Sequence, residues 1–163
     1  MTWFDYGVLL VIALSVVLGG WRGFVREAFA LAGWVAAAVL GFLFAKPVAA
    51  LAFGFVPEPF ARAVLAFLAI FLVVLIGTGL AGLLVARAVH AAGMGLSDRM
   101  LGAVFGVARG CVMVLLVVLA AGLTSVPQEP FWRGSRLAAP LETAALATKP
   151  YLPAALAERI AYR

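Results

Sequence analysis

An all-α membrane protein with four transmembrane helices is the fold class that the sequence predicts, and three observations lead to it. Hydrophobic residues make up 66% of the 163 residues, and the mean hydropathy is +1.17. Only 12% of the residues are charged, which is about half the share in a typical soluble domain. Four runs contain no charged residue at all: residues 6–21, 28–45, 63–86 and 110–128. Because roughly 20 apolar residues in a helix cross the hydrocarbon core of a bilayer, each run predicts one span.

The boundaries of the spans follow from the residues that flank them. We expect helices over about residues 4–20, 24–45, 60–90 and 99–123, arranged as two hairpins. Lys46-Pro47 should end the second helix, because proline has no N–H to continue the helical hydrogen bonds. Residues 47–59 are apolar but too short to span, and predict a short helix at the membrane interface. Ser97 or Asp98 is expected to cap the start of the fourth helix.

The residues after the fourth span differ in composition and predict a tail. We therefore divide the chain into a four-helix transmembrane domain, residues 1–125, and a Pro-containing tail, residues 126–163. Apolar residues recur at helical spacing in two stretches of the tail: Leu137, Leu141 and Ala145, then Leu152, Leu156 and Ile160. Apolar stripes opposite charged residues are typical of short amphipathic helices that lie on a membrane surface. The alternative is a loosely ordered tail.

Basic residues in the short loops predict the orientation in the membrane. The turns after the first and third spans are rich in arginine, whereas the turn after the second span is poor in basic charge. This distribution favours both termini outside the cytoplasm, although the basic residues of the tail argue for the reverse. The residues are Arg22, Arg26, Arg87, Arg99 and Arg109 in the rich turns, Lys46, Glu58 and Arg62 in the poor turn, and Arg133, Arg136, Lys149, Arg159 and Arg163 in the tail.

Charges stand beside glycines in both arginine-rich turns, in the stretches GGWRGFVRE (residues 19–27) and SDRMLGAVFGVARG (residues 97–110). A charged side chain at the centre of a membrane helix costs about 3 kcal/mol, so such groups pair or reach towards the headgroups. We interpret the charges as a structural ion network that joins Arg109 to Glu27 or Asp98. The alternative is a polar site for an ion, a lipid headgroup or a solute. The candidate polar network consists of Arg22, Arg26, Glu27, Asp98, Arg99 and Arg109.

The glycines of the same turns are spaced four residues apart. Such small-xxx-small (GxxxG) spacing places small residues on one helix face, where the backbones of two membrane helices can approach closely. We therefore expect Gly19, Gly23, Gly102, Gly106 and Gly110 to form packing faces.

Residues that would support enzymatic chemistry are scarce. His90 is the one histidine and has no cluster of Cys, Asp or Glu near it in the sequence, which argues against a metal site. The stretch GTGLAG (residues 77–82) matches a dinucleotide-binding fingerprint, but it lies inside an apolar run with no strand before it. We expect no enzyme, no cofactor, no metal and no nucleic-acid partner.

The two charged stretches together resemble the colicin V production protein family, over roughly residues 1–125. The matching positions are Asp5, Ser15, Gly19, Arg22, Gly23, Phe24, Arg26, Glu27, Trp34, Asp98, Arg99, Leu101, Gly102, Gly106, Arg109 and Gly110. The resemblance implies a multi-pass protein of the bacterial inner membrane, needed for producing or exporting the peptide toxin colicin V. In some relatives a trypsin-like protease domain follows outside the cytoplasm, which agrees with termini outside.

Two function classes remain open at this point. The first is an envelope or secretion factor without enzymatic chemistry that supports production or export of a bacteriocin through partners. The second is a small oligomeric channel or transporter with a polar path near Glu27, Asp98 and Arg109. The partners expected are the lipid bilayer and either further copies of the chain or another envelope protein.

Overall fold

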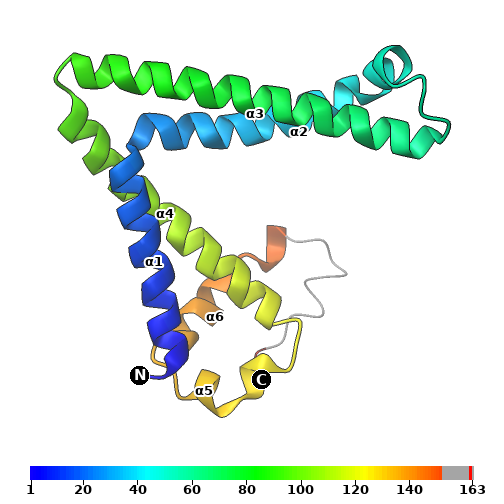
Figure 1. Ribbon diagram of the computed structural model, residues 1–163. Helices are drawn as coiled ribbons and strands as arrows, with labels where there is room; N and C mark the ends of the chain where they lie inside the picture. The colour runs from blue at the N-terminus through cyan, green and yellow to red at the C-terminus, as the bar shows by residue number, and fades with distance from the viewer. Residues whose placement is uncertain (152–161, 163) are drawn as a thin grey trace. The chain divides into compact units, whose positions relative to one another are not determined.

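The computed structural model describes residues 1–151 and residue 162, and its main elements are four long helices. They are α1 (Trp3–Arg22), α2 (Phe24–Ala52), α3 (Pro59–Ala91) and α4 (Gly95–Ala121), as Figure 1 shows. Four short elements follow: a 3-10 turn at Val126–Gln128, α5 (Pro130–Arg133), α6 (Ala138–Ala147) and a 3-10 turn at Lys149–Tyr151. All four long helices are long and apolar enough to cross a membrane, and the described residues contain no strand. The predicted fold class is confirmed.

The outward faces of these helices are apolar. On α3, for example, Val73 and Leu84 are 70% and 63% exposed, and most large apolar side chains of this helix are exposed as well. Monomeric soluble proteins rarely expose apolar surface on this scale, because water solvates it poorly. Lipid chains solvate it well, so the exposed faces fit a multi-pass membrane protein.

The chain forms two compact units. The first, which we call the terminal unit, consists of Met1–Gly20 and Ala103–Arg163; the second, the hairpin unit, consists of Trp21–Gly102. The last residues of α1 and the first turns of α4 therefore belong to the hairpin unit. The described residues of the tail group with α1 and the larger part of α4.

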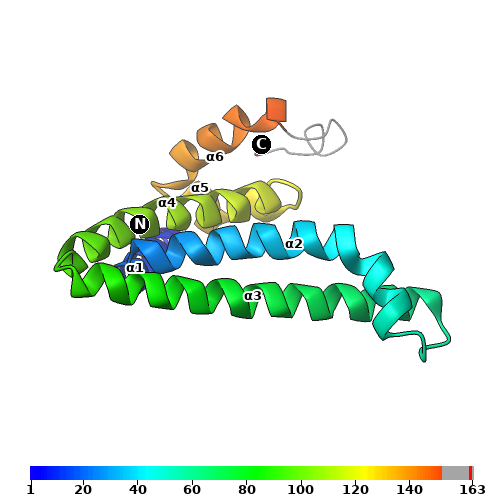
Figure 2. The ribbon, with the colours of Figure 1, turned by 90° about the horizontal axis from the view of Figure 1, so that it is seen from above.

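In the hairpin unit, α2 and α3 lie side by side along their length (Figure 2). Glycines allow the close approach, since a Cβ added to Gly33 would collide with the side chain of Thr78. A Cβ added to Gly82 would lie 2.7 Å from the Cβ of Phe29. The Thr78 hydroxyl donates to the backbone carbonyl of Val74, at 2.8 Å, so this polar group is satisfied within its own helix. Close contacts at these glycines thus hold together two helices whose charged residues lie towards their ends.

The expected end of the second helix at Pro47 is wrong. Pro47 lies inside α2, which continues to Ala52, so residues 47–52 form no separate interfacial helix. Proline removes one backbone hydrogen bond and usually kinks a helix rather than always ending it. Figure 2 shows the last turns of α2 (cyan) turning away from the axis of the rest of the helix. In the following turn, the guanidinium of Arg62 donates to the backbone carbonyl of Val56 at 2.8 Å.

In the terminal unit, α1 and α4 pack together with the tail around one apolar core. The buried residues of this core are Phe4, Val8, Val114, Val118, Trp132, Ala138 and Ala145. Leu137 and Leu141 pack against it, so the first apolar stripe of the tail faces the protein. The second stripe, Leu152, Leu156 and Ile160, lies outside the described residues.

Candidate functional site

Asp98, in the hairpin unit, is a predicted polar residue that contacts two other helices. The expectation that Asp98 or Ser97 caps α4 is wrong, because α4 already begins at Gly95. The Asp98 carboxylate instead accepts a hydrogen bond from the backbone N–H of Val25, at 2.9 Å, in the first turn of α2. The first N–H groups of a helix have no partner within the helix, and a negative charge there also interacts well with the helix dipole. Asp98 therefore caps α2 from a distant part of the chain.

Gly23 makes this contact possible. Its φ of +84° lies in the left-handed region, which side chains other than glycine rarely adopt. A Cβ at this position would also collide with the carboxylate of Asp98. The glycine at position 23 thus serves the approach of a carboxylate as well as the turn between α1 and α2.

Two further side-chain contacts lie in the hairpin unit. The Nε2 of His90 is 3.3 Å from the second carboxylate oxygen of Asp98, so the end of α3 joins the same cluster. One guanidinium nitrogen of Arg22 is 3.6 Å from a carboxylate oxygen of Glu27. Glu27 and Asp98 are both buried, with 4% of each residue exposed, whereas Arg22, Arg26 and Arg99 are exposed. Sequence reasoning missed His90, whose only signal was its place eight residues before Asp98.

Arg109 holds a second polar contact, inside the terminal unit. Its Nε donates to the hydroxyl of Ser15 at 2.9 Å, and a terminal nitrogen donates to the Ser15 backbone carbonyl at 3.1 Å. Both bonds join α4 to α1. An arginine with its donors directed at protein oxygens is a favourable arrangement within an apolar span.

The backbones of α1 and α4 approach closely around this arginine. A Cβ added to Gly106 would collide with the backbone carbonyl of Ser15, and one added to Gly110 would lie 3.0 Å from the Cα of Ile12. Gly19 and Gly102 are buried in α1 and α4 respectively. Backbone contact at Gly106 leaves no room for a side chain.

The structure thus distributes the six predicted network residues over both units. Arg22, Arg26, Glu27, Asp98 and Arg99 belong to the hairpin unit, and Arg109 belongs to the terminal unit. The expected pairing of Arg109 with Glu27 or Asp98 joins the two units and stays a prediction. Within the units, the sequence did not predict the contacts of Arg109 with Ser15 or those of Asp98 with Val25 and His90.

Asp5, in the first turn of α1, binds the tail, which the sequence did not predict either. It is fully buried, and its carboxylate accepts from the hydroxyl of Ser135 at 2.5 Å and from the backbone N–H of Leu137 at 3.0 Å. It also accepts from the backbone N–H of Thr2 at 2.7 Å. The signals in the sequence were a lone acidic residue at the start of the first apolar run and a serine in the distant tail.

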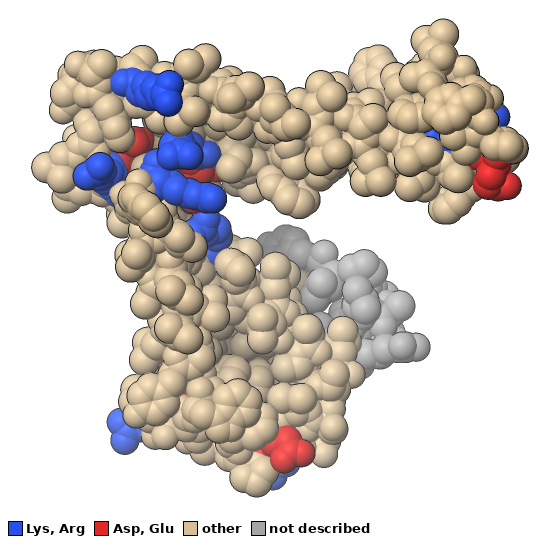
Figure 3. All heavy atoms as spheres, in the orientation of Figure 1, with Lys and Arg blue, Asp and Glu red and all other residues tan. Residues whose placement is uncertain are grey.

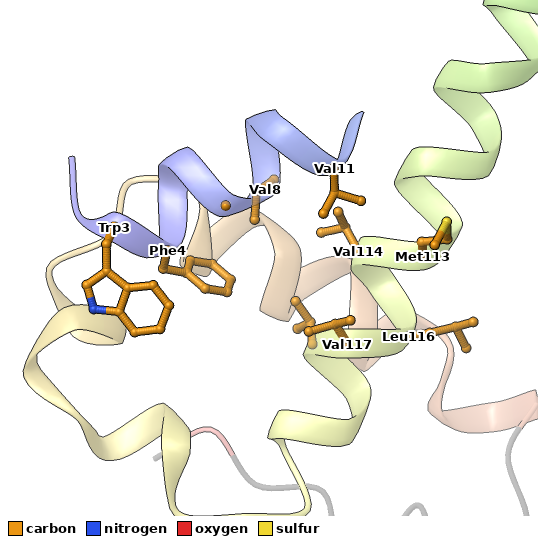
Figure 4. A pocket seen from close by; sticks show the side chains of 10 residues that line it. Trp3, Phe4, Val8, Val11, Met113, Val114, Leu116 and Val117 are labelled. Atoms are coloured by element: carbon orange, nitrogen blue, oxygen red, sulfur yellow. The ribbon is translucent and has the colours of Figure 1, made fainter. Parts of the chain in front are cut away.

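The terminal unit also has an apolar groove, with a volume of about 420 Å³, between α1 and α4. Figure 4 shows Phe4, Val8 and Val11 on one side and Met113, Leu116 and Val117 on the other, with Trp3 at one end. Gly7 also lines the groove, and a Cβ added there would meet nothing within 4 Å. The lining is apolar, so the groove suits a hydrocarbon rather than a polar solute.

The polar contacts described above share one chemical property. In the contacts of Asp98 with Val25, of Asp5 with Leu137 and of Arg109 with Ser15, a carboxylate accepts from a backbone N–H or a guanidinium donates to oxygens of a segment far away in the sequence. Buried polar groups are expensive unless they are hydrogen-bonded, so these bonds specify which segments meet.

The family model and two curated relatives point to the same protein family. The family model described as Colicin V production protein matches residues 4–146. A protein of Haemophilus influenzae named "Colicin V production protein homolog" is 30% identical over 134 residues, which cover 82% of this chain and 82% of that protein. The "Colicin V production protein" of Escherichia coli is 30% identical over 138 residues, 84% of this chain and 85% of that protein. No solved structure matches.

Proposed function

Because this chain belongs to the colicin V production protein family, we propose that it is an inner-membrane envelope factor that supports bacteriocin production or export without enzymatic chemistry. The observation that carries the proposal is the extent of the similarity. It runs over residues 4–146, and therefore over all four long helices and into α6. A role that depends on the whole helical assembly fits this extent better than a role located in one motif.

The contacts of the polar residues support a scaffold. Asp5 fixes the tail, Asp98 fixes the start of α2, and Arg109 joins α4 to α1. Each contact defines the arrangement of helices whose outer faces are apolar. A scaffold of this kind works by presenting its surface to lipid and to other envelope proteins.

The proposed location is the bacterial inner membrane with both termini outside the cytoplasm. The arginine-rich turns after the first and third spans support this orientation, because basic short loops stay in the cytoplasm. The related proteins found in E. coli and H. influenzae support a bacterial setting.

The function is tested by complementation. Cells of E. coli that lack their own colicin V production protein and carry the genes for colicin V receive this chain, the E. coli relative or an empty vector. We expect the chain to restore the toxin in the medium, measured by growth inhibition of a sensitive lawn. Toxin levels inside the cells separate production from export. If the chain reaches the membrane in the same amount as the relative and the toxin does not return, the proposal fails.

The charged Arg109 inside α4 is the observation that favours a small oligomeric channel as the second candidate, since charges within spans often line solute paths. Purified protein in proteoliposomes distinguishes the two. A scaffold leaves the liposomes tight to ions and small solutes, whereas a channel releases them. Release that disappears in Arg109→Leu, with the protein still folded, would favour the channel.

A further inference from the structure

Exposed arginines gather at one end of the hairpin unit. They are Arg22, Arg26, Arg87 and Arg99. Along the sequence, each arginine lies within three residues of Asp98 or of the two residues that the Asp98 carboxylate contacts, Val25 and His90. Two stretches that are far apart in the sequence, residues 22–26 and 87–99, thus bring exposed arginines to the same end of the unit. Figure 3 shows basic side chains (blue) gathered at this end of the unit, with a long uncharged surface beyond them.

The acidic side chains of the same region do not balance this charge at the surface. Glu27 and Asp98 are 4% exposed, and the carboxylate of Asp98 is directed at Val25 and His90. Arg22, which lies near Glu27, still has 57% of its side chain exposed. The surface at this end therefore presents positive charge.

The neighbouring exposed residues indicate the depth of this surface in the membrane. Trp21 is 77% exposed directly beside Arg22, and Met100 is 64% exposed directly beside Arg99. Tryptophan side chains collect at the level of the lipid headgroups, where one part of the ring is apolar and another part meets water. Each of the four arginines lies near an end of a long apolar helix, at the level of the lipid headgroups. Phospholipid phosphates are therefore the anions closest to them.

We propose that Arg22, Arg26, Arg87 and Arg99 form a binding site for the phosphate groups of anionic phospholipids. A planar guanidinium can donate two hydrogen bonds to one phosphate, and arginine is more weakly hydrated than lysine. Basic residues at a membrane surface attract anionic lipids with a gain of about fivefold in affinity for each residue. The buried Asp98 acts as the positioning residue, because it holds α2, α3 and the start of α4 together beneath the site.

Lipid retention by the purified full-length protein tests the site. The protein is exchanged in mild detergent with phosphatidylglycerol or phosphatidylcholine of the same acyl chains, and bound lipids are counted by native mass spectrometry. We expect wild type to retain phosphatidylglycerol preferentially, and the preference to weaken as salt rises. The triple variant Arg26→Gln, Arg87→Gln, Arg99→Gln should lower the affinity for phosphatidylglycerol about a hundredfold, since each arginine contributes a factor on the order of five. Arg22 is left unchanged because Glu27 lies beside it.

Two control variants make the result specific. Lys46→Gln, Arg133→Gln, Arg136→Gln removes the same charge from other exposed positions and should keep the preference. Arg26→Lys, Arg87→Lys, Arg99→Lys keeps the charge and should retain most of the binding. Equal retention of the two lipids by wild type would overturn the proposal, and so would equal losses in all three variants. Displacement of the lipid by millimolar inorganic phosphate would assign the arginines to a soluble anion and would also overturn it.

Discussion

The carboxylate of Asp98 lies 2.9 Å from the backbone nitrogen of Val25, although 73 residues separate them in the chain. One side chain thereby satisfies one N–H of the first turn of α2, contacts His90 near the end of α3 and belongs itself to the first turn of α4. The turn from α3 to α4 is thus attached to the turn from α1 to α2.

Removing this carboxylate should destabilise the protein. Asp98→Ala loses a helix cap and leaves the partly buried N–H of Val25 without its acceptor, which together cost about 1–2 kcal/mol. Asp98→Asn keeps an acceptor oxygen and should cost less. Unfolding of the purified protein in detergent, followed by circular dichroism, measures the loss. Glu58→Ala is the matched control, because Glu58 also accepts from a helix N–H, that of Phe60, but at the exposed start of α3. Equal losses for Asp98→Ala and Glu58→Ala would show that burial of the cap is irrelevant.

A single methyl group at Gly106 should separate α1 from α4. Its Cβ would collide with the backbone of Ser15, and backbone cannot move aside as the end of a side chain can. Gly106→Ala should therefore lower stability by about 1–3 kcal/mol. Gly77→Ala, in α3, is the control, since a Cβ there meets nothing within 4 Å and alanine favours the helix. If Gly106→Ala unfolds at the same temperature as Gly77→Ala, the close approach of the two backbones is wrong.

Loss of the Asp5 carboxylate should release the tail. Asp5 holds the backbone of Arg136 and Leu137, so trypsin reaches the bond after Arg136 only when this contact opens. Asp5→Ala should be cleaved there at least several times faster than wild type, because opening no longer breaks these bonds. Glu129→Ala removes an exposed carboxylate from the same region and should be cleaved at the wild-type rate. Mass spectrometry of the fragments identifies the site, and unchanged cleavage of Asp5→Ala would contradict the contact.

Labelling of single cysteines should reveal the orientation. In a Cys111→Ser background, a cysteine in place of Thr143 should react with a membrane-impermeant thiol reagent in intact cells. A cysteine in place of Ser97 should react only after the cells are opened, since the arginine-rich turns are proposed to be cytoplasmic. Both positions are exposed on the protein, so only the membrane protects one of them. The opposite pattern would reverse the orientation.

The long helices could be predicted because the length of each charge-free run matches the number of helical residues needed to cross the bilayer. Pro47 misled the assignment, since a proline within a long apolar run can be accommodated by a kink. The partners of the polar residues could not be predicted in the same way. In the sequence, Asp98 looks like a cap for its own helix, because Ser97-Asp98 follows a turn that contains glycines. In the structure, its carboxylate instead accepts from Val25 in α2, 73 residues away in the chain. Nothing in the sequence links Asp5 to Ser135, because the hydrogen bond between them depends on how α1, α4 and the tail pack.

The central claim is that the polar residues support toxin production by holding the helices together, and one measurement tests this claim most directly. In the complemented E. coli strain, colicin V in the medium is divided by the amount of folded protein in the membrane, for wild type, Asp98→Ala and Ser15→Ala. Asp98 and Ser15 are proposed to act only by holding helices together, so their variants should lose toxin in proportion to folded protein. The ratio should therefore equal that of wild type. A loss of toxin in Asp98→Ala or Ser15→Ala with the wild-type amount of folded protein would contradict the scaffold and assign these residues to a polar path.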